Sequence, residues 1–343
     1  MGSARPPVDD PSSHGHEAGA RSDARRMVDK PLTMLRFGFM VAATGGILAL
    51  LIGRSGSALL LTLLHTRRGW VAASLAMAGA SVLLGALRWK IVLGAMSYRI
   101  GFGRALAVVL AAWPLAVVTP SRANDFARAF AIRGAVPIAA GTGSVLAEKV
   151  VDIAVLFALA WLGAAIEGLW ALASLMLLGL AAELAIVRAM TAVRAPSAPG
   201  VAGGRWLRGR PALAKKVEEL LVASRVLVRA PGRLVLACVV SLSIRLLTLG
   251  MTYALLRAAD AGVGVIDTCA LWPVATLVGL VPITLAGMGT RDAAFVYLLG
   301  LRGHLVTRAS VLAATMAYSV IAVGLFAIIG LPFMVRESTR RRS

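Results

Sequence analysis

The sequence is poor in charged residues. Asp, Glu, Lys and Arg together make up 15% of its 343 residues, whereas a soluble globular domain usually has about a quarter. Hydrophobic residues make up 59%, and several stretches hold the roughly 20 apolar residues that a helix needs to cross a bilayer. These proportions exclude an ordinary soluble domain and predict an all-α polytopic membrane protein.

Cysteine and histidine are also scarce, with two and four residues. Cys238 and Cys269 both lie in apolar runs, which argues against a disulfide or a cysteine-based metal framework. His14 and His16 form a closely spaced pair, but two ligands do not make a metal site. The phosphate-binding pattern G-x-x-x-x-G-K-[ST] is absent, so ATP binding is not expected. We expect neither a metal nor a cofactor.

Acidic residues are few relative to basic ones, with 16 against 36 and a net charge of +20. On a soluble protein this excess would suggest a nucleic-acid partner. Here the basic residues lie mostly between apolar segments, which favours positive-inside topology and attraction to anionic lipids. We therefore expect membrane lipids, anionic or zwitterionic, as partners and no nucleic acid.

Four stretches rich in Lys or Arg are predicted to be cytoplasmic, which places both termini inside: a disordered tail 1–32, loop 88–104, loop 188–233 and a basic tail 336–343. The connection 166–168 has no Lys or Arg and is predicted outside. Apolar residues at helical spacing between Leu213 and Val228 indicate either an amphipathic helix on an anionic membrane surface or a solvated loop helix.

Eight or more hydrophobic segments lie within a predicted transmembrane domain, 33–335. Six are read as full spans: 34–53, 70–87, 143–165, 169–187, 234–256 and 305–334. A further short apolar piece, 58–64, could lie in the membrane interface. The predicted sidedness requires the remaining segments to return to the face from which they start. We expect 105–118 with 123–134 to form a re-entrant hairpin from the cytoplasm, and 267–285 with 291–301 to form one from outside. Two pairs of short full spans would give the same sidedness.

This order of segments predicts an inverted repeat, 34–165 and 169–334, of the kind found in many transporters. The motif WPLAV at 113–117 resembles WPVAT at 272–276. Each is followed by a second proline, Pro120 or Pro282, and then by a charged helix start. The second tip is longer and contains Gly287 and Gly289.

Charged residues cluster at these predicted tips and in the span that follows the first. A charge at mid-bilayer costs about 2.5–3.5 kcal/mol on insertion scales, so such residues usually pair or line a pathway. Helix capping by Asn124 or Thr290, and an ion-pair network of Glu148, Lys149 and Asp152 with Arg122 or Arg128, would be purely structural uses. A polar substrate cavity is the other use, and arginine suits phosphate because its planar fork binds bidentately. The candidate headgroup-binding residues are Arg122, Asn124, Asp125, Arg128, Glu148, Lys149, Asp152, Arg291 and Asp292.

Four motifs carry a family resemblance: LRWKIVL from Leu87, P-x-R-x-N-D-x-x-R from Pro120, EKVVD from Glu148, and G-x-G-x-R-D from Gly287. In this order they resemble the lysylphosphatidylglycerol synthase transmembrane, or flippase-like, family over about residues 35–335. The family more often has Gly-Glu at Asn124-Asp125, Arg at Lys149 and Glu at Asp292. The resemblance implies the lipid-translocating half of such proteins. Because the chain ends soon after its last predicted span, we expect no soluble aminoacyl-transferase domain.

The function that the sequence predicts is a lipid translocator of the bacterial cytoplasmic, or inner, membrane, moving a phosphate-bearing or zwitterionic lipid. A non-catalytic scaffold for an enzyme that synthesises or modifies lipids or glycolipids is the alternative. An integral membrane enzyme, such as a lipid-linked glycosyl or acyl transferase, is less favoured because no His, Cys or Ser nucleophile constellation is visible.

Overall fold

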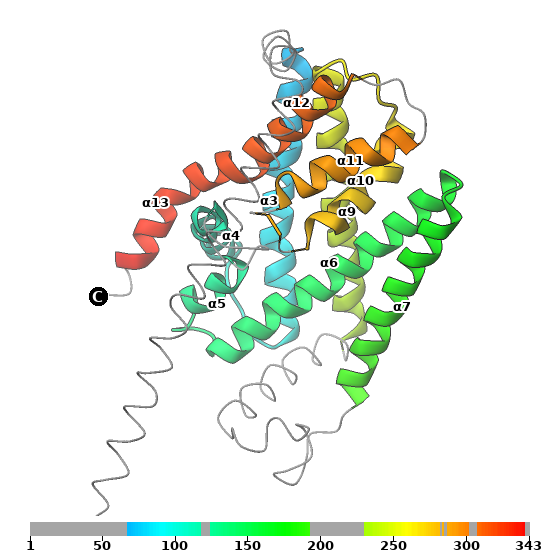
Figure 1. The fold of residues 1–343 in the computed structure, drawn as a ribbon. Coiled ribbons are helices and arrows are strands. Elements are labelled where there is room, and N and C mark those ends of the chain that lie inside the picture. Colours follow the sequence, from blue (N-terminus) through cyan, green and yellow to red (C-terminus); the bar gives the residue numbers. More distant parts are fainter. Residues whose placement is uncertain are drawn as a thin grey trace, which may run out of the picture.

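The computed structural model describes residues 67–117, 124–192, 230–281, 283–284, 287–301 and 307–339, and all regular secondary structure within these ranges is helical (Figure 1). The elements are α3 (Arg68–Ala95), α4 (Phe102–Ala112) with the 3-10 turn η1 (Trp113–Val117), α5 (Ala127–Ala131), α6 (Ile138–Ile166), α7 (Trp170–Ala192), α9 (Pro231–Ala258), α10 (Val265–Gly279), α11 (Thr290–Leu301), α12 (Arg308–Ser319), the π-helical turn η4 (Val320–Leu325) and α13 (Phe326–Thr339).

Five helices in the described ranges are long and apolar enough to cross a membrane: Arg68–Ala95, Ile138–Ile166, Trp170–Ala189, Pro231–Ala258 and the continuous run Arg308–Thr339. Large apolar side chains on them remain exposed, such as Leu178 at 66% and Ile328 at 67%. Such surface is stable against lipid tails and unfavourable against water. The all-helical prediction is therefore confirmed for the described residues, with five candidate spans.

Several predicted features lie outside the described residues. These are the tail 1–32, the span 34–53, the piece 58–64 and most of loop 188–233. The last helix continues to Thr339 and so includes the first residues of the predicted tail 336–343. In the same way α3 continues to Ala95, eight residues beyond the predicted end of its segment.

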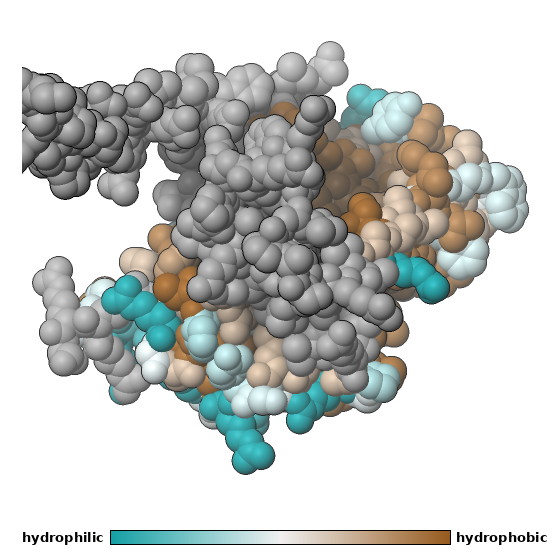
Figure 2. Space-filling view, turned by 90° about the horizontal axis from the view of Figure 1, so that it is seen from below, coloured by the Kyte–Doolittle hydropathy of each residue, from teal (hydrophilic) through white to brown (hydrophobic). Residues whose placement is uncertain are grey.

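The antiparallel pair α3 and α9 defines two ends of the molecule. The Arg67 amide donates a hydrogen bond to the Ala258 carbonyl at 3.2 Å, and the Arg233 guanidinium donates to the Gly94 carbonyl. The end of α3 and the start of α9 therefore lie together, and we call this end the lower face. Figure 2 views the lower face, where hydrophilic side chains lie around the edge beside apolar surface.

The segment 102–137 starts and ends near the lower face. Ile132 and Val136, which follow α5, pack in one cluster with Trp89 and Leu93 of α3, and Ile100 packs against the same cluster. Near the other end of the molecule, α10 and α11 lie side by side (Figure 1). Both short-helix pairs thus pack against longer helices, with part of their surface exposed, as at Phe130 and Tyr297.

Two glycines allow long helices to touch the short ones closely. A Cβ atom at Gly163 of α6 would lie 2.4 Å from the Ala270 carbonyl oxygen of α10, and one at Gly330 of α13 would lie 2.3 Å from the Leu110 carbonyl oxygen of α4. Only glycine leaves room for backbones this close. As a result, the last long helix of each predicted repeat packs against the short helix of the other repeat.

The last long helix is interrupted by the π-helical turn Val320–Leu325. Such turns are rare and occur mostly as single turns within α-helices, often at functional sites. The Tyr318 ring lies before this turn with its centroid 5.1 Å from that of Trp272. The Phe326 ring follows the turn, 5.6 Å from Trp113. The π turn therefore lies between two aromatic contacts that join α12 and α13 to the short helices.

Candidate functional site

A single guanidinium joins three helices in the core. Because α3 continues past its predicted end, Arg88 is buried at 9% exposure. Its Nε lies 3.2 Å from Glu148 Oε1 and its Nη1 lies 2.8 Å from Asp152 Oδ1, both on α6. Nη1 also donates to the Ser241 hydroxyl of α9 at 2.9 Å. The i,i+4 spacing of the two acids places them one turn apart, where one arginine reaches both.

Two further arginines complete the ion pairs of these acids. Arg128 Nη2 lies 2.8 Å from Glu148 Oε2, and Arg245 Nη2 of α9 lies 2.5 Å from Asp152 Oδ2. Each buried carboxylate therefore lies between Arg88 and a second arginine. Charges buried in this way are tolerated because they are paired and hydrogen-bonded.

A second, half-buried pair lies beside α5. The Lys149 ammonium contacts the Asp125 carboxylate, and Asp125 Oδ1 also lies 3.5 Å from Arg128 Nη2. Arg128 thus connects the half-buried pair with the buried one. The side chains of the pair are 25% and 22% exposed, so water and solutes can reach them more easily than Glu148, which is 1% exposed.

The short helix α5 is positioned by contacts on both of its sides. Asn124 Nδ2 donates to the Ala112 carbonyl of α4 at 3.2 Å. On the other side, the Arg128 guanidinium lies 5.1 Å from the Trp89 ring centroid, a cation–π distance. The Trp89 indole is itself fixed by a 2.9 Å hydrogen bond to the Ser144 hydroxyl. A five-residue helix could not hold this geometry alone, so α3, α4 and α6 provide it.

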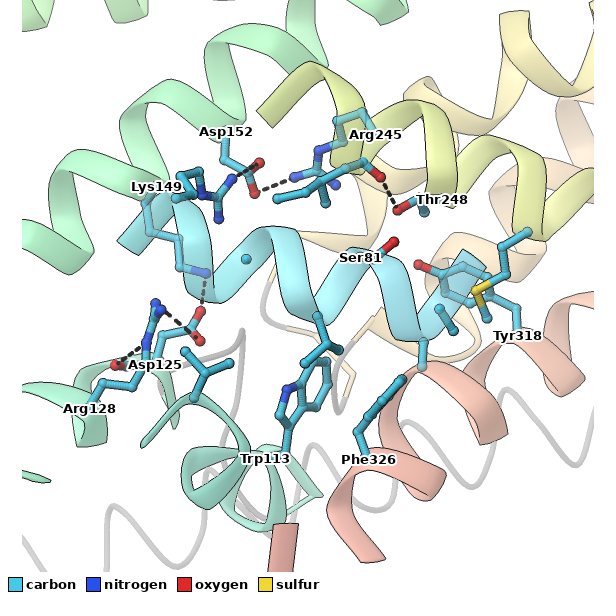
Figure 3. A pocket seen from close by; sticks show the side chains of 18 residues that line it. Ser81, Trp113, Asp125, Arg128, Lys149, Asp152, Arg245, Thr248, Tyr318 and Phe326 are labelled. Atoms are coloured by element: carbon cyan, nitrogen blue, oxygen red, sulfur yellow. Dashed lines mark hydrogen bonds and ion pairs between the residues drawn. The ribbon is translucent and has the colours of Figure 1, made fainter. Parts of the chain in front are cut away.

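These residues surround a cavity of about 140 Å³ (Figure 3). Its wall is charged at one end, where Asp125, Arg128, Lys149, Asp152 and Arg245 gather. The other end is aromatic and apolar, with Trp113, Phe326 and Tyr318 among its lining residues. The cavity is therefore amphipathic, and its volume suits a small ionic group with some water.

The charges of the described cluster do not cancel. Arg88, Arg128, Lys149 and Arg245 supply four cations, while Asp125, Glu148 and Asp152 supply three carboxylates. One positive charge is left over. In a low-dielectric interior such an excess attracts a single anionic group strongly.

The second tip has its own ion pair. Arg291 Nη2 lies 2.8 Å from Asp292 Oδ1 and donates to the Ser319 hydroxyl at 2.7 Å. Its guanidinium carbon lies 4.9 Å from the Trp272 ring centroid and 4.4 Å from that of Tyr318. Asp292 Oδ2 in turn accepts the Gly289 amide at 3.1 Å, which stabilises the start of α11. Arg291 does not line the cavity, but it lies against Tyr318, which does. The ion pair of the second tip therefore supports the cavity wall from behind.

Gly287 and Gly289 have positive φ angles, 73° and 89°, which side chains other than glycine rarely adopt. A Cβ atom at Gly287 would also lie 2.5 Å from the Gly279 carbonyl oxygen. We expect Gly287→Ala to destabilise the protein by about 2 kcal/mol and to lower its thermal unfolding midpoint in detergent. Gly134→Ala is the matched control, because nothing lies within 4 Å of a Cβ atom there. Equal midpoints for the two variants would contradict this reading of the tip.

The structure brings together most of the predicted site residues that it describes. Asp125, Arg128, Lys149 and Asp152 line the cavity, and Glu148 lies behind them. Asn124 holds the tip by its contact with α4, whereas Arg291 and Asp292 form the separate pair. Pro120, Arg122 and Pro282 lie outside the described residues.

Two charged residues of the cavity wall, Arg88 and Arg245, are not among the predicted site residues. Arg88 stands one residue after a predicted segment end, within a predicted basic loop. Arg245 lies in the middle of the predicted span 234–256. An ionisable residue inside an apolar span is the signal that could have identified Arg245. Among the described residues, no group of three or more His, Cys, Asp or Glu side chains could hold a metal ion.

Comparison with known proteins gives one family. The family model described as the lysylphosphatidylglycerol synthase TM region matches residues 36–330, close to the range 35–335 over which the motifs show the resemblance. Comparison with curated protein sequences finds no match. The predicted family is therefore confirmed.

Proposed function

The chain belongs to the lysylphosphatidylglycerol synthase transmembrane-region family, and from this membership we propose that it is a non-enzymatic translocator that moves a phosphate-bearing lipid across a membrane. One observation carries the proposal. The cavity lies between a charged cluster with one excess positive charge and an aromatic, apolar wall, inside a domain with several apolar helices. A lipid headgroup and the first part of its tails have this same combination of properties.

Electrostatics favours phosphate as the group that the cavity binds. Arginine binds phosphate oxygens with two parallel hydrogen bonds, and three arginines belong to the cluster. A phosphodiester carries one negative charge, which balances the single excess cation. Binding at Arg245 would leave Asp152 its contact with Arg88, so that neither buried carboxylate loses every partner.

Alternating access requires two units that can move against each other. We propose that 102–137 and 265–301 are re-entrant hairpins that enter from opposite faces and belong to two inverted repeats. The reciprocal glycine contacts support this proposal, because Gly163 and Gly330 place the last long helix of each repeat against the hairpin of the other. Rocking of one repeat against the other would open the cavity to each side in turn.

The same proposal gives an orientation. The predicted cytoplasmic stretches 88–104 and 188–233 include the end of α3 and the start of α9, which lie at the lower face. We propose that this face is cytoplasmic in a bacterial inner membrane, because basic loops remain on that side. The lipid would then enter from, or leave to, the cytoplasmic leaflet near this face.

The test is translocation in proteoliposomes by wild-type protein and by Arg245→Gln. This change removes the excess positive charge while Asp152 keeps its pair with Arg88, so we expect the variant to fold. Translocation of a tail-labelled phosphatidylglycerol should fall by at least about ten-fold, equivalent to about 1.4 kcal/mol of lost transition-state stabilisation. The rate is measured as the loss of dithionite-accessible fluorescence.

Two controls belong to this experiment. Lys90→Gln removes one positive charge from an exposed position on α3 outside the cavity, and it should translocate lipid at the wild-type rate. A labelled glycolipid without phosphate should move slowly with every variant. Equal rates for Arg245→Gln and wild type would overturn the proposed site. Folded wild-type protein that moves no lipid would favour the scaffold function instead.

A further inference from the structure

A groove lies on the side of α5 that faces away from the cavity. Two adjoining hollows of about 320 and 360 Å³ form it between α4, α5 and α13, and they share Phe130, Ala131 and Glu337 in their walls. We call it the α4–α13 groove. It is separate from the cavity, because Asp125 before α5 and Arg128 of α5 line the cavity, whereas Ala127, Phe130 and Ala131 of α5 line the groove.

The groove is apolar along most of its length and charged at one end. Val108, Ala111, Ala112 and Leu115 line it from a single face of α4 and η1, and the alanines leave the space open. The charged end is formed by Arg104, which contacts Glu337 of α13, and by the exposed Arg133. Ile100 lies at this end, so the charges adjoin the lower face.

The dimensions match a lipid tail. Arg104 and Leu115 are eleven residues apart, which corresponds to about 16 Å along a helix at 1.5 Å per residue. One leaflet contributes about half of the roughly 30 Å hydrocarbon core, so a single tail is about 15 Å long. The two arginines and one carboxylate at the charged end leave one excess positive charge among them, which complements a phosphodiester.

We propose that the α4–α13 groove binds one acyl chain of a phospholipid from the leaflet at the lower face, with the lipid phosphate at Arg104 and Arg133. This inference rests on the proposed function, since it gives the translocated lipid a docking position beside the cavity. The tail remains in the groove while the headgroup lies near α5, whose opposite side lines the charged cavity wall.

Photo-crosslinking tests the groove directly and needs no translocation. The full chain is reconstituted in vesicles that contain phosphatidylglycerol with a diazirine in its acyl chain, and labelled peptides are mapped after illumination. We expect strong labelling of peptides that contain Leu115, Phe130 or Met334, reduced by excess unlabelled phosphatidylglycerol. Exposed α7 residues such as Leu175 and Leu178 contact bulk lipid. Their labelling should fall only in proportion to the dilution of the probe by the unlabelled lipid.

Variants separate a built groove from ordinary lipid contact. The double variant Ala111→Leu, Ala131→Leu fills the groove. It should lose the part of the labelling that excess unlabelled phosphatidylglycerol reduces. Ala182→Leu is the matched control on the exposed surface of α7 and should keep it. For the charged end, Arg133→Gln should weaken the labelling, whereas Arg99→Gln, another exposed arginine near the lower face, should not.

Three results would overturn the inference. Groove peptides that label no more than α7 peptides would show ordinary lipid contact. Groove peptides that stay unlabelled, with 34–53 cross-linked to them by a short chemical cross-linker, would show that this part of the chain fills the groove. If a diazirine diacylglycerol without phosphate labels the groove as strongly as phosphatidylglycerol, Arg104 and Arg133 do not bind the lipid phosphate. A different result would overturn the proposed function and leave the groove in place. In that case unlabelled phosphatidylglycerol still reduces the groove labelling, but Arg245→Gln translocates lipid at the wild-type rate.

Discussion

Arg88→Leu is expected to destabilise the protein by about 3–5 kcal/mol, the usual cost of removing one partner from a buried ion pair. The change removes three contacts at once: the ion pairs with Glu148 and Asp152 and the hydrogen bond to Ser241. Each carboxylate keeps one arginine but loses the group that joins α3 to α6 and α9. The thermal unfolding midpoint of the purified protein in detergent measures the loss, and lipid translocation should be lost with it.

Two comparisons make the Arg88 prediction specific. Lys90→Gln removes an exposed cation two residues away on the same helix and should leave the midpoint unchanged. Arg88→Lys keeps the charge but has no planar fork, so it should recover only part of the stability. If Arg88→Leu unfolds at the same temperature as Lys90→Gln, the central ion-pair network does not hold these helices together.

Gly163→Ala should reduce the free energy of unfolding by about 3 kcal/mol, at the upper end of the cost of overpacking a core. The added methyl group would meet backbone atoms of Ala270, 2.4 Å from its carbonyl oxygen and 2.5 Å from its Cα, and a helix backbone cannot move aside locally. α6 and α10 must therefore separate, which also displaces Trp272 and the cavity wall that it supports. Thermal unfolding in detergent and translocation are both measured.

Other helical glycines provide graded controls for Gly163→Ala. A Cβ atom at Gly179 would meet the Phe157 ring at 2.4 Å, but a side chain can rotate away, so Gly179→Ala should cost less. Gly79 has nothing within 4 Å, and Gly79→Ala should be neutral or stabilising by up to about 1 kcal/mol because alanine favours helix. If Gly163→Ala were the most stable of the three variants and Gly79→Ala the least stable, the close approach of α6 and α10 would not be required.

The sequence predicts the helical segments well because apolar runs of sufficient length indicate helices directly. The predicted segments 143–165 and 234–256 correspond to α6 and α9, and the helices extend beyond them by one to five residues at each end. The extensions matter most at α3. A basic residue after an apolar run resembles a loop residue, yet Arg88 lies inside the helix because buried acids of α6 neutralise it.

The pairing of charges could be predicted only in part. The spacing of Glu148 and Asp152 predicts a shared helix face, and an arginine partner such as Arg128 was one of the uses considered. Which arginine meets which acid depends on how α3, α5, α6 and α9 pack, and no local pattern contains that information. The candidate residues Arg291 and Asp292 show the same limit. Arg291 lies against the Tyr318 ring, and this ring lines the cavity, a relation that depends on how α11 and α12 pack.

The π-helical turn Val320–Leu325 accommodates an extra residue between two of the chain's contacts. Tyr318 meets Trp272 before the turn, and Gly330 meets Leu110 after it. A π turn, with its i→i+5 hydrogen bonds, holds one residue more than the α-helical turn that it replaces. Deleting one residue within the turn, such as Gly324, would let the stretch return to a regular α-helix and leave Gly330 facing α4. Deleting a residue after the turn, between Phe326 and Gly330, would instead rotate Gly330 by about 100° away from α4. The turn is therefore a place where the length of this helix can change without changing which face meets the short helices.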